Sequence, residues 1–245
     1  MTMSNESTPR SPADLRQVIA EEARYGANEI RRSWKRIALL FAVILLPLWG
    51  FGELADEVRE GEAFFFDKPV LEWMRAMHAP APDRFFLIAS KLGYEWGVVP
   101  FDVLLVVVLA AMRRYREGLF AGLTLAGSGL LNLAAKQYFG RERPSLWESL
   151  APEGTYSFPS GHAMGSMTLA AVLVLLAWPT RWRWPVLLLM LAFVIAVGAS
   201  RVYLGVHYPS DILAGWAAAL AWVFGIYLLL FRRAYRPWQD RRTGR

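Results

Sequence analysis

The stretch SFPSGHAMGSMTLAAVLVLLAW, residues 157–178, places a histidine where a polar turn meets a long apolar run. A Pro-Ser-Gly turn comes first, His162 follows, and nearly every later residue of the stretch is apolar. A run of this kind is typical of a helix that crosses a bilayer, which takes about 20 residues. His162 at its edge is either a packing residue or half of a catalytic pair, and the rest of the chain distinguishes the two.

The composition indicates a membrane protein. The chain has 245 residues, 55% of them hydrophobic, with eleven tryptophans and a net charge of +6. It has no cysteine, which excludes disulfides, thiolate metal sites and a cysteine nucleophile. Residues 1–36 contain no apolar signal-peptide core, so the first apolar segment is expected to be an uncleaved anchor.

The apolar runs predict an all-α fold, a bundle of six transmembrane helices. The spans are placed near 37–54, 94–112, 118–136, 162–179, 184–201 and 211–231. Residues 55–93 are interpreted as an outer loop with interfacial or re-entrant helices.

The two tails flank this six-span domain, which covers residues 37–232. Residues 1–36 form a cytoplasmic tail, with an amphipathic helix from Ser11 onward that lies on the membrane or, alternatively, in solvent. Residues 233–245 form a basic cytoplasmic tail.

Basic residues predict the orientation. They cluster at 31–36, 113–116, 181–183 and 232–242, which all fall on one side of the six-span arrangement. By the positive-inside rule that side is the cytoplasm. A bacterial inner membrane, with both termini cytoplasmic and the opposite helix ends facing the periplasm, fits this pattern.

The remaining polar residues gather at the outer helix ends. They are Lys136 at the end of the third span, Arg141 and Arg143 directly after it, His162 at the start of the fourth, Arg201 at the end of the fifth, and His207 and Asp211 at the start of the sixth. Charged groups at membrane depth are expensive and usually mark function. Lys136, Arg143 and Arg201 suit a phosphate group, and we call them the phosphate cradle. The backbone N–H groups of Ser160 and Gly161, before a helix start, favour an anion as well.

The histidines suit phosphoryl transfer. A neutral imidazole can attack phosphorus and form a covalent intermediate. Asp211 follows His207 by four residues, close enough to hold its other nitrogen. His162 can then protonate the leaving group.

Three segments together resemble the signature motifs of the type 2 phosphatidic acid phosphatase (PAP2) superfamily. They are KQYFGRERP from Lys136 to Pro144, PSGH from Pro159 to His162, and SRVYLGVHYPSD from Ser200 to Asp211. The resemblance covers about residues 37–232, and every signature position matches.

The resemblance implies a metal-independent lipid phosphatase without a cofactor. His207 would form a phosphohistidine, Asp211 would orient it, and His162 would be the general acid. The phosphoryl oxygens would be bound by Lys136, Arg143, Ser160, Gly161 and Arg201. Because His207 must be neutral and His162 charged, a bell-shaped pH profile is expected.

The expected partners are the bilayer and a membrane lipid phosphate, with no nucleic acid. Candidate substrates are undecaprenyl pyrophosphate, phosphatidylglycerophosphate and phosphatidic acid. The preferred lipid and the oligomeric state stay open at this stage.

Three other functions are compatible with parts of the pattern. A phosphotransferase would use the same intermediate with a glycolipid acceptor. A serine hydrolase built on Ser160 would leave the three cations unexplained and lacks a Gly-x-Ser-x-Gly elbow. A lipid transporter would place its charges nearer the membrane midplane.

Three polar residues occupy no signature position. We expect Arg141 to be a rim charge and His78 to be a surface residue in the outer loop. Asp102 falls inside the second span, where an acid is costly without a partner or water, so it could face the site.

Overall fold

The computed structural model describes Ala38 and residues 41–231, and residues 43–231 belong to one compact unit. In this described part all regular structure is helical, as the sequence predicted. The elements are η1 (Phe41–Leu45, a π-helical turn), α2 (Leu46–Glu60), α3 (Asp67–Ala76), α4 (Pro80–Leu92), α5 (Val98–Ala111), α6 (Tyr115–Phe139), α7 (Gly161–Ala177), α8 (Arg183–Tyr203) and α9 (Pro209–Phe231). The predicted amphipathic helix within 1–36 and the basic tail 233–245 lie outside the described residues.

Three of the described helices, α6, α8 and α9, are long and apolar enough to cross a membrane. Helices α5 and α7 are apolar but shorter. These five helices coincide with five predicted spans to within a few residues. The count of six spans stays a prediction.

Helix α2 extends beyond the first predicted span. That span was ended at residue 54, whereas the helix continues to Glu60. The prediction followed apolarity, and polar residues such as Glu53 and Asp56 ended the apolar run without being helix breakers. The helix stops at Gly61, the next residue with a strong C-cap preference.

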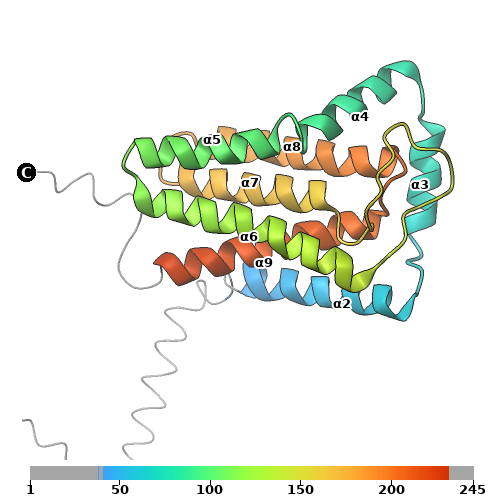
Figure 1. The fold of residues 1–245 in the computed structure, drawn as a ribbon, viewed down its shortest axis with the longest axis horizontal. Coiled ribbons are helices and arrows are strands. Elements are labelled where there is room, and N and C mark those ends of the chain that lie inside the picture. Colours follow the sequence, from blue (N-terminus) through green and yellow to red (C-terminus); the bar gives the residue numbers. More distant parts are fainter. Residues whose placement is uncertain (1–37, 39–40, 232–245) are drawn as a thin grey trace, which may run out of the picture. The chain divides into compact units, whose positions relative to one another are not determined.

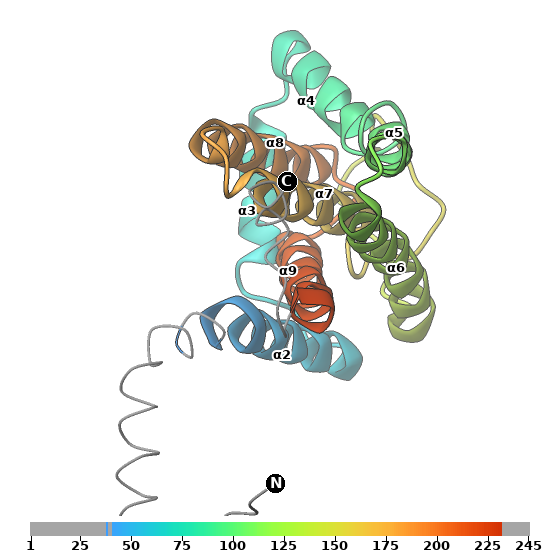
Figure 2. The same ribbon diagram turned by 90° about the vertical axis from the view of Figure 1, so that its left-hand side faces the viewer.

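Helix α7, which carries His162, is the central helix of the unit. It contacts α5, α6, α8 and α9, and the end-on view of Figure 2 shows these helices around it. Helix α9 passes α7 closely at Gly215, where an added Cβ would lie 2.9 Å from the carbonyl oxygen of Ser160. This approach lets the amide of Ser160 donate to the carbonyl oxygen of Asp211 at 3.1 Å. Small residues thus place two of the signature segments side by side.

The predicted outer loop contains the helices α3 and α4. Helix α4 packs on α8, and α3 contacts both α8 and α9. Figure 1 shows α3 and the α6–α7 loop (residues 140–160) at the same end of the helices. The described part of the predicted outer loop therefore lies beside the candidate site.

The prediction for His78 is wrong. Its side chain is only 14% exposed, and its ring stacks on Tyr203 with the centroids 4.3 Å apart. Nε2 of His78 donates to the carbonyl oxygen of Tyr203 at 2.9 Å, while Nδ1 accepts from Arg75. The connection between α3 and α4 folds against the end of α8, a tertiary contact that has no signature in the local sequence.

Candidate active site

The predicted site residues come from four helix ends and two connections, and the structure brings their side chains together at one end of the helices. They are Lys136 near the end of α6, Arg143 in the α6–α7 loop, His162 in the first turn of α7, Arg201 in the last turn of α8, His207 between α8 and α9, and Asp211 in the first turn of α9. The prediction that these segments converge is therefore confirmed, whereas the chemical roles of the residues stay predictions.

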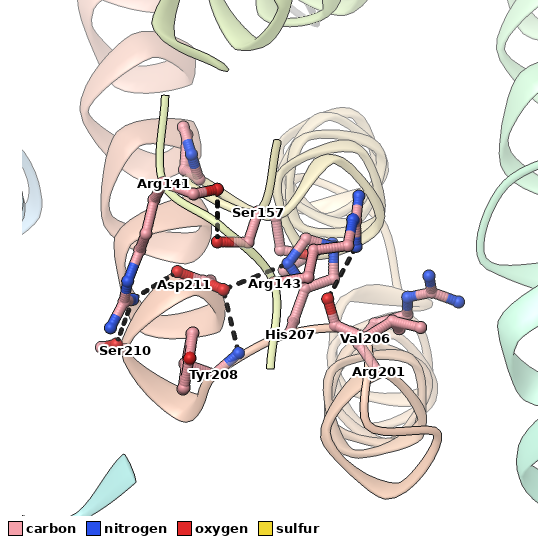
Figure 3. Close-up of polar contacts among 12 residues, drawn as sticks. Arg141, Arg143, Ser157, Arg201, Val206, His207, Tyr208, Ser210 and Asp211 are labelled. Atoms are coloured by element: carbon pink, nitrogen blue, oxygen red, sulfur yellow. Dashed lines mark hydrogen bonds and ion pairs between the residues drawn. The ribbon is translucent and has the colours of Figure 1, made fainter. Parts of the chain in front are cut away.

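His207 and Asp211 form a fully buried pair. Nδ1 of His207 lies 3.2 Å from Oδ2 of Asp211, and Nε2 lies 3.1 Å from Nη1 of Arg143 (Figure 3). A guanidinium can only donate, so Nε2 accepts and Nδ1 carries the proton that it donates to Asp211. The lone pair of Nε2 therefore faces the phosphate cradle.

The surroundings keep His207 uncharged. Burial lowers the pKa of His207 well below its ordinary value, and the nearby cations of Arg143, Arg201 and Lys136 lower it further. The carboxylate of Glu153 acts in the opposite direction but does not compensate. Neutral imidazole is the state that a nitrogen nucleophile requires.

Arg143 is held on several sides by the chain around it. Nη1 donates to the carbonyl oxygen of Val206 at 2.7 Å, and Nε donates to that of Thr155 at 2.6 Å (Figure 3). These bonds fix the plane of the guanidinium beside Nε2 of His207. A fixed planar fork matches the oxygens of a phosphoryl group.

Lys136 and Arg201 complete the cradle. Nζ of Lys136 donates to the carbonyl oxygen of Tyr156 at 2.5 Å. Arg201 is 1% exposed and donates from Nη1 to the hydroxyl of Ser90. Its Nε is buried without a partner among the described residues. An unpaired buried donor is costly, and a phosphoryl oxygen is an acceptor that would satisfy it.

Glu153 in the α6–α7 loop is a site residue that the sequence did not reveal. Its Oε2 lies 2.6 Å from Nη2 of Arg143, and its Oε1 pairs with Arg201 and lies 3.7 Å from Nδ1 of His162. The carboxylate thus occupies the space between the two arginines and His162. Burial alone would raise the pKa of Glu153, but the positive charges of Arg201, Arg143 and Lys136 hold it below its ordinary value.

His162 lies at the edge of this cluster. Its side chain is 14% exposed, and its ring centroid is 5.1 Å from that of Tyr94. It is therefore within reach of both the cradle and solvent. Its role as general acid stays a prediction.

Ser160 and Gly161 are engaged by neighbouring helices. The amide of Ser160 donates to Asp211, as described above, and its hydroxyl accepts from the amide of Ala163 at 3.4 Å as the N-cap of α7. That hydroxyl retains its own hydrogen for a further acceptor. An added Cβ at Gly161 would lie 2.9 Å from Oδ1 of Asn132, so α6 makes the close approach there. The phosphate-binding roles of Ser160 and Gly161 stay predictions.

The prediction for Arg141 as a rim charge is wrong. Its side chain is 14% exposed, and its two terminal nitrogens contact the carboxylates of Asp211 and Asp67. Gly140 ends α6 with φ 58°, a left-handed conformation that turns the chain sharply. Arg141 follows this turn directly, so its side chain reaches inward instead of toward the rim.

Asp102 lines a cavity between α5, α6 and α7. The cavity has a volume of about 680 Å³ and a mainly apolar lining, and its wall includes Tyr94 and Gly161, which lie next to His162. Oδ1 of Asp102 has no partner among the described residues. We call this cavity the α5–α7 groove.

Metal binding has no support within Ala38 and residues 41–231. No group of three or more His, Cys, Asp or Glu side chains in this part is arranged to hold a metal ion. The expectation of metal independence stays a prediction.

Comparison with known proteins shows the family of the chain. The model of the PAP2 superfamily matches residues 117–235. A phosphatidylglycerophosphatase B of Bacillus subtilis is 33% identical over 143 residues, which are 55% of this chain and 68% of that protein. The chain belongs to the PAP2 superfamily.

Two further proteins extend the comparison. An undecaprenyl-diphosphatase of Sulfolobus acidocaldarius is 33% identical over 132 residues, 52% of this chain and 60% of that protein. The crystal structure of a transmembrane PAP2-type phosphatidylglycerolphosphate phosphatase from Bacillus subtilis superimposes with a TM-score of 0.68. It is 25% identical and covers 78% of this chain and 98% of that one. The predictions of a PAP2 membrane fold and a lipid phosphate phosphatase are thereby confirmed.

Proposed function

We propose that this PAP2 protein hydrolyses a phosphate monoester or diphosphate of a membrane lipid through a phosphohistidine at His207. The observation that carries the proposal is the orientation of His207. Its protonated Nδ1 faces Asp211, and the lone pair of Nε2 faces Arg143. A phosphoryl group bound by the cradle would therefore meet the nucleophilic nitrogen.

The first step forms the intermediate. Nε2 of His207 attacks phosphorus while the bond from phosphorus to the leaving oxygen breaks. Asp211 stabilises the positive charge that develops on the ring. His162 gives its proton to the leaving oxygen, and the cradle balances the charge on the phosphoryl oxygens.

The second step releases phosphate. His162, now neutral, takes a proton from water, and the oxygen of that water attacks phosphorus. The bond from phosphorus to nitrogen breaks, and its electron pair returns to Nε2. The protein is then restored, with inorganic phosphate as the product.

The substrate is proposed to be a lipid whose phosphate lies at the membrane surface. The α5–α7 groove leads from beside His162 between apolar helices, and its volume lies within the range of about 300–1,000 Å³ typical of ligand sites. It would hold the first part of an acyl or isoprenyl chain. Undecaprenyl pyrophosphate, phosphatidylglycerophosphate and phosphatidic acid all fit this description, and the names of two relatives include the first two classes.

The topology belongs to the same proposal. Six spans with the basic clusters in the cytoplasm would place the site on the outer side of a bacterial inner membrane. Cysteine accessibility at the exposed Glu148→Cys and Arg181→Cys positions would test this sidedness, because the natural chain has no cysteine. We expect a membrane-impermeant reagent added from outside to label position 148 and not position 181. Labelling at position 181 alone would show that the orientation is the opposite of the proposed one.

Phosphate release tests the activity. Purified protein in detergent with EDTA is given each candidate lipid, with His207→Ala in parallel. Metal-independent release by the natural chain alone is the expected result. Release only when a glycolipid acceptor is added would favour transfer, and no turnover in either case would contradict the proposal.

A further inference from the structure

We propose that Arg141 and Asp67 are positioning residues that hold Asp211 in place against His207. The inference rests on the proposed phosphatase function and extends it to a helix outside the signature motifs. Asp67 is in the first turn of α3, within the predicted outer loop. Neither residue occupies a signature position of the three motifs.

One guanidinium joins two carboxylates. Nη1 of Arg141 lies 2.6 Å from Oδ1 of Asp211, and Nη2 lies 2.9 Å from Oδ2 of Asp67 (Figure 3 shows the Asp211 contact). Ser210 completes the cluster, because its hydroxyl accepts from Arg141 at 2.8 Å and donates to Asp67 at 2.6 Å. The amide of Ser210 donates to the other oxygen of Asp67 at 2.9 Å. Asp67 thereby anchors both Arg141 and the start of α9.

The cluster is shielded from solvent. Asp67 is 4% exposed and Asp211 is 0% exposed. The guanidinium of Arg141 lies over the ring of Tyr208 at 4.1 Å and near that of Phe64 at 5.6 Å. Removing one partner from such a buried charge pair costs far more than removing an exposed one. Arg141 therefore has a defined orientation toward Asp211.

In this arrangement the two carboxylate oxygens of Asp211 have different partners. Oδ1 is used by Arg141, which leaves Oδ2 for the amide of Tyr208 at 2.9 Å and for Nδ1 of His207. Without Arg141 the buried Oδ1 would lose its charged partner, and the carboxylate could rotate away from His207. The contact thus sets which oxygen faces the imidazole.

Asp67 also leaves a net negative charge beside His207. Arg141 alone beside Asp211 would form a neutral pair and weaken the stabilisation of a positive imidazole. Two carboxylates sharing one guanidinium keep one net negative charge beside His207. That charge is available when the ring becomes cationic during attack.

This charge balance predicts that variants of Arg141 and Asp67 shift the acidic limb of the pH profile of kcat/KM in opposite directions. The other charged or titratable groups around His207 are Lys136 from α6, Arg143 and Glu153 from the α6–α7 loop, His162 from α7, Arg201 from α8 and Tyr208 beside α9. They are unchanged in the variants below. Removing the positive Arg141 should raise the pKa of His207, and removing the negative Asp67 should lower it.

The test measures kcat, KM and the pH dependence of kcat/KM with a short-chain phosphatidic acid. The variants are Arg141→Gln, Asp67→Asn and the double variant, with Arg84→Gln and Asp56→Asn as exposed controls. We expect kcat to fall about 10- to 100-fold with KM little changed, because the side chains of Arg141 and Asp67 bind each other, Ser210 and Asp211 and not the phosphate cradle. The acidic limb should move to higher pH in Arg141→Gln and to lower pH in Asp67→Asn.

Coupling and rescue complete the test. The double variant should lose less than the product of the two single losses, since both act through Asp211. Arg141→Lys should recover part of kcat, because lysine keeps the charge but cannot bridge both carboxylates as a fork. If Arg141→Gln does not purify as a monodisperse protein, Asp67→Asn decides the matter by its fall in kcat and by the shift of its acidic limb to lower pH.

The outcomes that contradict the positioning role differ from those that contradict the proposed phosphatase function. Unshifted acidic limbs, or shifts in the same direction in both single variants, would overturn the positioning role while the natural chain still released phosphate. If the natural chain itself released no phosphate, or His207→Ala were as active, the proposed function would fail first.

Discussion

The carboxylate of Glu153 lies against the guanidinium of Arg143, with Oε2 2.6 Å from Nη2. Its other oxygen pairs with Arg201, so one side chain contacts two of the three cations of the phosphate cradle. A phosphoryl group would use the same donors. If the proposed function holds, substrate and Glu153 compete for the cradle.

Glu153→Gln should increase the affinity for phosphate-like anions. The amide is similar in shape but carries no charge, so a bound anion would displace a weaker competitor. Inhibition constants for inorganic phosphate and vanadate should fall about tenfold, corresponding to about 1.4 kcal/mol. Glu148→Gln, an exposed glutamate of the same loop, is the matched control and should leave both constants unchanged. Equal inhibition constants in the natural chain and Glu153→Gln would show that Glu153 and the anion do not compete for the cradle.

The pH profile should reflect the neutral state of His207. A histidine with a lowered pKa loses its proton at lower pH, so the nucleophile is fully available at pH 7 and is lost only as the pH falls through that lowered pKa. The acidic limb of kcat/KM is therefore expected below pH 6.5, the ordinary pKa of histidine. Because Glu153 raises the pKa of His207, Glu153→Gln should move this limb to still lower pH. An acidic limb above 6.5 in the natural chain would contradict the assignment.

Filling the α5–α7 groove should lower kcat/KM for lipids with long chains but not for lipids with short chains. Gly129 lines the groove, and an added Cβ there would meet nothing within 4 Å. Gly129→Leu should reduce kcat/KM about tenfold for long-chain phosphatidic acid and leave a short-chain analogue unaffected. Gly225→Leu is the control, because it also has free space for a Cβ but lies on α9 outside the groove lining. Equal losses for both chain lengths would exclude the groove as the tail site.

The helices and the signature residues of the site could be predicted because their signals are local. Apolar runs located the helices, and Lys136, His162 and Arg201 stand out as polar residues at the ends of such runs. Their proposed role in phosphate chemistry follows from residue type and order. The structure adds the tautomer of His207, which depends on the contact with Arg143.

Glu153 and Asp67 could not be predicted in the same way. Glu153 is one of several acidic residues in an irregular loop, and its partner Arg201 is 48 positions away in the chain. Asp67 meets Ser210 across 143 positions. Neither periodicity nor a motif links such pairs, so only the packing of α3 and the α6–α7 loop against α8 and α9 reveals them.

His162→Ala gives the most direct test of the central claim, the phosphohistidine at His207. Farnesyl diphosphate labelled on its terminal phosphate has a leaving group that departs without a proton, so the first step should proceed while the water attack is slowed. Rapid acid-free quenching and peptide mapping should then find an alkali-stable, acid-labile phosphoryl group on His207. Label on Ser160, or continued hydrolysis with no phosphorylated protein, would contradict the account.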